Sequence, residues 1–71
     1  MTPPWTAEEA ELLQQLREQA GLDAMRFAMQ NAISLAQLQQ LENGGDSCFY
    51  SPAIKAHSGR KLLMKLQTQK R

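Results

Sequence analysis

The sequence predicts an all-α fold, a compact bundle of four to five helices that contains a helix-turn-helix unit. Apolar residues recur at helical spacings of three and four along most of the chain. Residues that cap helices stand before each of these stretches. No stretch alternates polar and apolar residues in the manner of a half-buried strand. At 71 residues the chain is long enough for one domain, which we assign to residues 1–71.

The first predicted helix begins after a flexible arm at residues 1–5. Thr6 and Glu9 have the spacing of a capping box, in which each side chain bonds the backbone N–H of the other. Gly21 is the expected stop, because glycine adopts the left-handed conformation that ends many helices. The apolar stripe between these signals consists of Leu12, Leu13, Leu16 and Ala20.

The second and third helices are predicted to be short and close together in the sequence. Asp23 caps a helix over residues 24–30, and Ser34 caps another over residues 35–42, before Asn43-Gly44-Gly45 ends it. Two short helices joined by such a brief connection are typical of a helix-turn-helix, here at about residues 23–42.

The last third of the chain is predicted to be helical from Ser51-Pro52 onwards. Gly59 is expected to separate a fourth helix from a fifth, because glycine costs about 1 kcal/mol inside a helix. A single bent helix is the alternative, and residues 68–71 form a frayed basic tail. The expected core consists of Leu13, Leu16, Leu22, Phe27, Ala28, Ile33, Leu38, Leu41, Ile54, Leu62 and Leu66.

Charge is divided unevenly along the chain. Residues 1–46 hold seven acidic and two basic residues, whereas residues 47–71 hold six basic residues and no acid. A basic segment of this kind suits a phosphate backbone or an acidic protein surface, or it is a solvated helix face.

The chain has few of the residues that catalyse reactions or bind metal ions. His57 and Cys48 are the only histidine and cysteine, and a zinc site needs three or four ligands. No catalytic set or phosphate loop is evident, so we expect no enzyme activity, no cofactor, no metal and no small-molecule substrate. A single cysteine also indicates a reducing compartment, the cytoplasm. Phe49 and Tyr50 either fill a gap between helices or form an exposed patch.

The helix-turn-helix region resembles the phage repressor and Cro-type (XRE-like) DNA-binding domains. The resemblance runs without a gap over about residues 12–44, and it implies a bacterial or phage transcriptional regulator. Glu42 matches a position that is expected to bond the turn or a nearby arginine. The matching residues are Leu16-Arg17, Ala20-Gly21-Leu22, Asp23, Phe27-Ala28, Ile33-Ser34, Leu38 and the run Gln40-Leu41-Glu42-Asn43-Gly44.

This resemblance implies that the third helix enters the major groove of duplex DNA, with a homodimer as a further expectation. The chain departs from the family at Ala24, Ala32, Leu35 and Ala36, where the family has glutamine, glycine or polar base-reading residues. The residues expected to contact DNA are Ser34, Leu35, Ala36, Gln37, Gln39, Gln40, Arg26 and Lys55.

The alternative function is protein contact through the same fold. Some bacterial membrane-anchored cytoskeletal proteins carry a similar domain that binds protein, and the basic segment from Arg60 to Arg71 would suit a position near a membrane.

Overall fold

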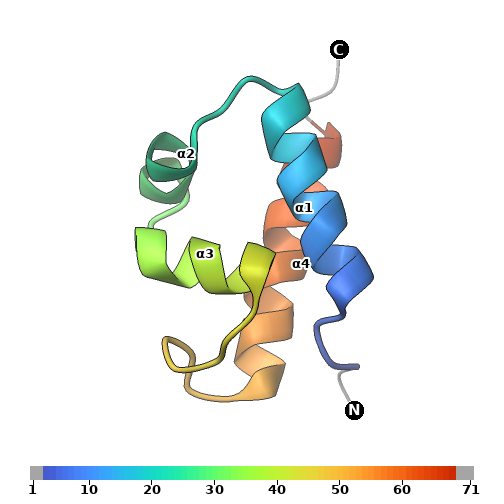
Figure 1. Ribbon diagram of the computed structural model, residues 1–71, viewed down its shortest axis with the longest axis vertical. Coiled ribbons are helices and arrows are strands. Elements are labelled where there is room, and N and C mark those ends of the chain that lie inside the picture. Colours follow the sequence, from blue (N-terminus) through green and yellow to red (C-terminus); the bar gives the residue numbers. More distant parts are fainter. Residues whose placement is uncertain (1–2, 69–71) are drawn as a thin grey trace.

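The computed structural model describes residues 3–68 and is all-helical, with no strand in that range. Its elements are α1 (Ala7–Gln19), α2 (Ala24–Gln30), α3 (Leu35–Asn43) and α4 (Pro52–Thr68). Figure 1 shows α1 alongside α4, and α3 contacts both α1 and α2, which lies above it in this view. The all-α prediction is therefore confirmed, whereas most of the expected basic tail lies outside the described residues.

The predicted capping residues all act at helix starts. The Thr6 hydroxyl accepts a hydrogen bond from the Glu9 backbone N–H at 3.1 Å, and Glu9 closes the capping box. Asp23 caps α2 in the same way, and Ser34 forms a second capping box with Gln37. Each cap satisfies a backbone donor that helix geometry leaves without a partner.

The prediction that Gly59 separates two helices is wrong. One continuous helix, α4, runs through Gly59, which is buried in its middle. The ring of Trp5 lies against this position so closely that a Cβ built on Gly59 would fall 2.5 Å from its Cζ3 atom. The glycine is present because only a residue without a side chain leaves room for the indole.

Continuity of α4 also decides which of its residues form the core. Its buried face repeats at helical spacing through Gly59, and it includes Ala56 and Leu63, which the expected core does not contain. Ile54 falls outside this face and is 46% exposed, so its assignment to the core is wrong. The buried apolar residues are Leu13, Phe27, Ala28, Leu38, Leu41, Ala56, Leu62, Leu63 and Leu66, with Leu16, Leu22 and Ile33 partly buried against them.

The two aromatic residues before α4 have different environments. Phe49 packs against the core cluster and is half-buried, as expected of a side chain that fills a gap between helices. Tyr50, its neighbour, is 95% exposed and makes no apolar contact with that cluster. The connection between α3 and α4 is therefore anchored by Phe49 alone among its aromatic residues.

Arg60 of α4 ties the start of the chain to the bundle. Its guanidinium donates hydrogen bonds to the carbonyl oxygens of Pro3 and Pro4 at 2.8 and 3.0 Å. It also donates to both carboxylate oxygens of Glu9 on α1, each at 2.9 Å. Residues 3–5, expected to be a flexible arm, are thus held against α4 by the hydrogen bonds of the Arg60 guanidinium.

We expect a modest loss of stability at acid pH that depends on Glu9. The hydrogen bond from Arg60 lowers the pKa of the Glu9 carboxyl below its usual value of 4.5. A lowered folded-state pKa contributes stability that is present above pH 4.5 and is lost as the pH falls through the folded-state pKa. Because the pair is partly exposed, we expect an effect below about 1 kcal/mol.

Urea unfolding of Glu9→Gln and the parent protein between pH 3 and pH 7 tests this expectation. The difference between the two proteins should shrink as the pH falls. Glu11→Gln is the matched control, because Glu11 is exposed and forms no ion pair within residues 3–68. An equal pH dependence for both variants would contradict the assignment to Glu9.

Candidate binding surface on α2 and α3

The connection between α2 and α3 is four residues long, from Asn31 to Ser34. Its shape is set by hydrogen bonds back to α2, from the Asn31 amide to the Phe27 carbonyl and from the Ile33 N–H to the Ala28 carbonyl. Ala32 has a φ of 58°, in the left-handed region that favours glycine. The turn therefore holds a residue with a side chain in a conformation that favours glycine, and the backbone is strained at Ala32.

A buried ion pair holds α3 against α1. The Arg17 Nε atom lies 2.7 Å from Glu42 Oε2, and Nη2 lies 3.0 Å from Oε1, so the pair is bidentate. The two side chains are only 10% and 4% exposed. Arg17 also donates to the Leu22 carbonyl at 2.8 Å, and its contact with Glu42 raises the pKa of the guanidinium. Of the two partners expected for Glu42, the turn or a nearby arginine, the carboxylate bonds the arginine.

Two of the glutamines expected to read DNA bases are bonded to the segment that follows α3. The Gln40 amide donates to the Ser47 hydroxyl at 2.7 Å and accepts from the Cys48 N–H at 2.9 Å. The Gln37 amide donates to the Cys48 carbonyl at 3.2 Å and accepts from the Ser34 N–H. Both side chains act within the fold, where they order the connection to α4.

Lys55, expected to contact a DNA phosphate, is likewise engaged in the fold. Its side chain is buried, and Nζ donates to the Gly45 carbonyl at 2.7 Å and to Asp46 Oδ1 at 2.9 Å. The lysine thus closes the loop after α3 onto α4. Its ammonium group is therefore already paired with a carbonyl oxygen and a carboxylate oxygen of this loop.

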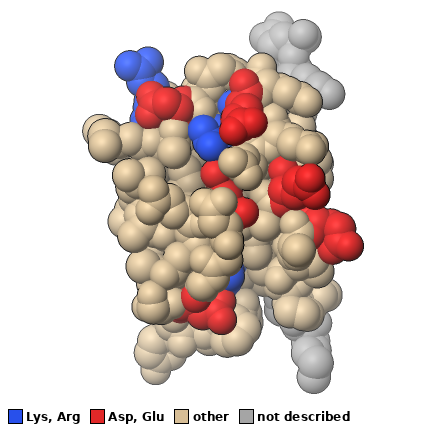
Figure 2. Space-filling view, in the orientation of Figure 1, with Lys and Arg blue, Asp and Glu red and all other residues tan. Residues whose placement is uncertain are grey.

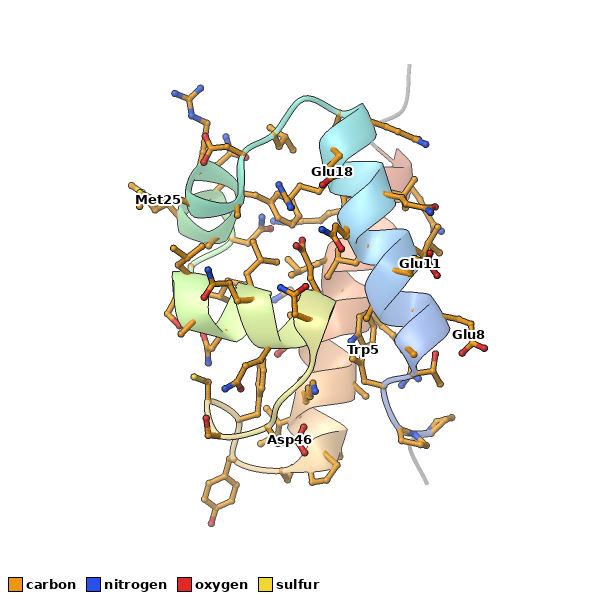
Figure 3. The ribbon with its side chains drawn as sticks, in the orientation of Figure 1. Trp5, Glu8, Glu11, Glu18, Met25 and Asp46 are labelled. Carbon is orange, nitrogen blue, oxygen red and sulfur yellow. The ribbon has the colours of Figure 1, made fainter. Side chains whose placement is uncertain are left out.

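The remaining predicted contacts lie at the surface near the start of α3. Ser34, Ala36 and Gln39 are exposed, Leu35 is half-buried, and Arg26 of α2 is exposed beside the α2 N-cap. The exposed face of α3 carries no charge, because its one acidic residue, Glu42, is buried against Arg17. In Figure 2, acidic atoms line the neighbouring α1, whose exposed Glu8, Glu11 and Glu18 are labelled in Figure 3.

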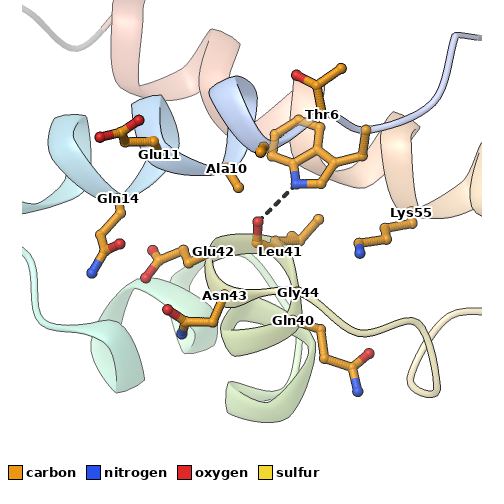
Figure 4. A pocket seen from close by; sticks show the side chains of 12 residues that line it. Thr6, Ala10, Glu11, Gln14, Gln40, Leu41, Glu42, Asn43, Gly44 and Lys55 are labelled. Carbon is orange, nitrogen blue, oxygen red and sulfur yellow. Dashed lines mark hydrogen bonds between the residues drawn. The ribbon is translucent and has the colours of Figure 1, made fainter.

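A cavity of about 320 Å³ lies between the start of α1 and the end of α3. Trp5 lines it and donates from its indole N–H to the Leu41 carbonyl at 2.8 Å, the bond drawn in Figure 4. Glu11 and Gln14 of α1 lie at one end and Lys55 at the other. Since its polar contacts already join helices to each other, we assign this cavity to the packing of the domain.

Comparison of the chain with protein-family models, with curated proteins and with solved structures finds no match. Within residues 3–68, no group of three or more His, Cys, Asp or Glu side chains is placed to hold a metal ion. Over the same residues, no helix combines the length and the apolar character needed to cross a bilayer.

Proposed function

We propose that the chain is a helix-turn-helix domain of the repressor and Cro type that binds duplex DNA through the start of α3. Two features support the proposal, the resemblance over residues 12–44 and the four-residue connection between α2 and α3. The observation that carries it is that the exposed side chains of α3 near its start, Ala36 and Gln39, carry no charge. An exposed acidic residue would repel a phosphate backbone, and the one acidic residue of α3, Glu42 in its last turn, is buried against Arg17.

The proposed contacts are fewer than the sequence indicates. Ala36 and Leu35 can touch thymine methyl groups, and Gln39 is the exposed glutamine able to pair with a base edge. Arg26 is an exposed cation on α2, while Asp23 and the acids of α1 oppose phosphates. With one or two phosphate contacts, the logarithm of affinity should fall with the logarithm of salt concentration at a slope of about −1 to −2. Affinity is therefore modest, and a dimer on repeated half-sites would raise it.

Titration of isotope-labelled protein with random-sequence duplex DNA at low salt tests the proposal. We expect amide shifts at the start of α2 and along α3, because these backbone groups would lie closest to the DNA. Ala36→Glu should abolish the shifts, since it places a carboxylate in the groove. Arg26→Gln should weaken binding severalfold by removing a phosphate contact.

Two matched controls separate a specific surface from net charge. Gln15→Glu adds the same charge as Ala36→Glu on an exposed position of α1, and Lys61→Gln removes the same charge as Arg26→Gln from α4. Neither control should change the shifts on α3 by as much as its partner. No shift at millimolar DNA, or shifts confined to residues 60–71, would refute DNA binding through α3.

A second candidate function is protein contact, and one observation favours it. Met25 and Met29 on the outer side of α2 are 58% and 73% exposed. Figure 3 shows Met25 directed away from the bundle. Methionine side chains adapt their shape to a partner and are frequent on protein-binding surfaces. Two neighbouring methionines at this degree of exposure are more easily explained by a protein partner than by DNA.

A further inference from the structure

A continuous surface joins α2, the turn after it and α4. One shallow hollow is lined by Met25, Met29 and Gln30 together with Asp23 and Arg26. A second hollow, of about 250 Å³, is also lined by Gln30, so the two adjoin. We name the combined area the turn–α4 surface. The rest of the second hollow is lined by Asn31, Ala32, Ile33, Ser58, Lys61, Leu62 and Lys65.

The turn–α4 surface carries the exposed lysines of α4. Lys61 and Lys65 are four residues apart, so they lie one above the other on the same side of the helix. Among residues 3–68 neither of them forms an ion pair, whereas Arg17, Lys55 and Arg60 each do. The only carboxylate that lines either hollow is Asp23, which accepts a hydrogen bond from the Arg26 backbone N–H. The surface therefore has excess positive charge.

Apolar groups accompany these charges. Leu62 forms the floor of the second hollow, Ile33 is half-buried beside it, and Met29 is largely exposed at the adjoining rim. A phosphodiester backbone offers nothing that would cover these side chains. A peptide with both carboxylates and aliphatic side chains would satisfy the lysines and cover the methionines at once.

We propose that the turn–α4 surface binds an acidic helical segment of a partner protein. Carboxylates four residues apart on that segment match the spacing of Lys61 and Lys65, while its leucine side chains cover Met25 and Met29. This site requires that the domain contacts protein, the second candidate function, and it is independent of DNA binding by α3. The two surfaces share Arg26 and Asp23, whereas Lys61 and Lys65 belong to the turn–α4 surface alone.

The probe is a blocked helical peptide of 14 residues with glutamates four residues apart and two leucines on the same side. Titrated into labelled protein at low salt, it should shift the amides of residues 25–33 and 58–65. The double variant Lys61→Gln/Lys65→Gln should raise the dissociation constant about fivefold or more, as expected for two lost surface charge pairs. Met29→Ser should also weaken binding, by removing apolar contact. A peptide with glutamine in place of glutamate should bind no better to the parent protein than to the double variant.

Matched controls identify the surface. Gln15→Glu/Gln19→Glu changes the net charge by the same amount on exposed positions of α1, and Leu12→Ser removes a partly exposed apolar residue there. Both should bind the peptide nearly as the parent protein does. The proposal is overturned if millimolar peptide gives no shift, or if the double variant binds equally well. It is also overturned if duplex DNA shifts the amide signals of residues 58–65 as strongly as the peptide does. A third contrary result is that these signals shift when the protein concentration rises without peptide, which would identify a second copy of the chain as the occupant. If DNA caused no amide shifts on α3, the DNA-binding proposal would fail and the peptide-binding proposal would still stand.

Discussion

Replacement of Glu42 by alanine should unfold the domain or reduce its stability by about 3–5 kcal/mol, because it leaves Arg17 charged and buried. Arg17 and Glu42 share two hydrogen bonds at 2.7 and 3.0 Å. After the substitution, the guanidinium would keep only its bond to the Leu22 carbonyl. A domain this small has little stability to lose. Urea unfolding followed by circular dichroism measures the loss.

The double variant Arg17→Met/Glu42→Leu distinguishes a lost ion pair from a general packing defect. It removes both charges and keeps similar volume, so its stability should be close to that of the parent protein or above it. If Glu42→Ala alone costs less than about 1 kcal/mol, water reaches Arg17 and the pair is not a buried one. If the double variant is as unstable as the single one, shape rather than charge dominates at this position.

Local signals in the sequence were sufficient to predict most helix boundaries. Thr6, Asp23, Ser34 and Ser51 each stand next to the backbone donors that they satisfy, within three residues along the chain. Such interactions depend on neighbours in the sequence, so the residue type and its spacing identify them. The expected cores of α1, α2 and α3 follow from the same helical spacing.

The roles of long polar side chains could not be predicted in this way. Lys55, Gln37 and Gln40 look like surface residues in the sequence, and their partners in the loop after α3 are seven to eleven residues away. Whether such a side chain points to solvent or to a backbone carbonyl depends on the path of the loop after α3. That path is set by tertiary packing, including Phe49 against the core. The candidate DNA surface is consequently smaller than the sequence suggests.

Gly59 was misjudged for a related reason. In the sequence it is a weak helix residue flanked by polar ones, and its cost of about 1 kcal/mol indicates a break. Its partner, Trp5, is 54 positions earlier, in a segment that looks like an arm. Only the packing of α1 on α4 brings the indole over the glycine. A helix can continue through glycine when a close contact elsewhere stabilises the fold by more than the glycine costs.

Removal of the Trp5 side chain should therefore be costly. Trp5→Ala loses the bond to the Leu41 carbonyl and the contact with α4, and it leaves a void between three helices. We expect a loss of about 3 kcal/mol, at the lower end for large-to-small changes because the indole is half-buried. Trp5→Phe should retain part of the contact and lose the hydrogen bond, so its loss in urea unfolding should be intermediate.

The effect of Gly59→Ala should change sign with the residue at position 5. In the parent protein the new Cβ would lie 2.5 to 2.7 Å from three atoms of the indole, so the ring must shift and stability falls by about 1–3 kcal/mol. In the Trp5→Ala background that obstacle is gone, and alanine should stabilise α4 by about 1 kcal/mol through its higher helix propensity. Urea unfolding of the four proteins measures the coupling, with Ser58→Ala in both backgrounds as a control for helix propensity alone. If Gly59→Ala has the same sign in both backgrounds, close contact with Trp5 is not the reason for the glycine.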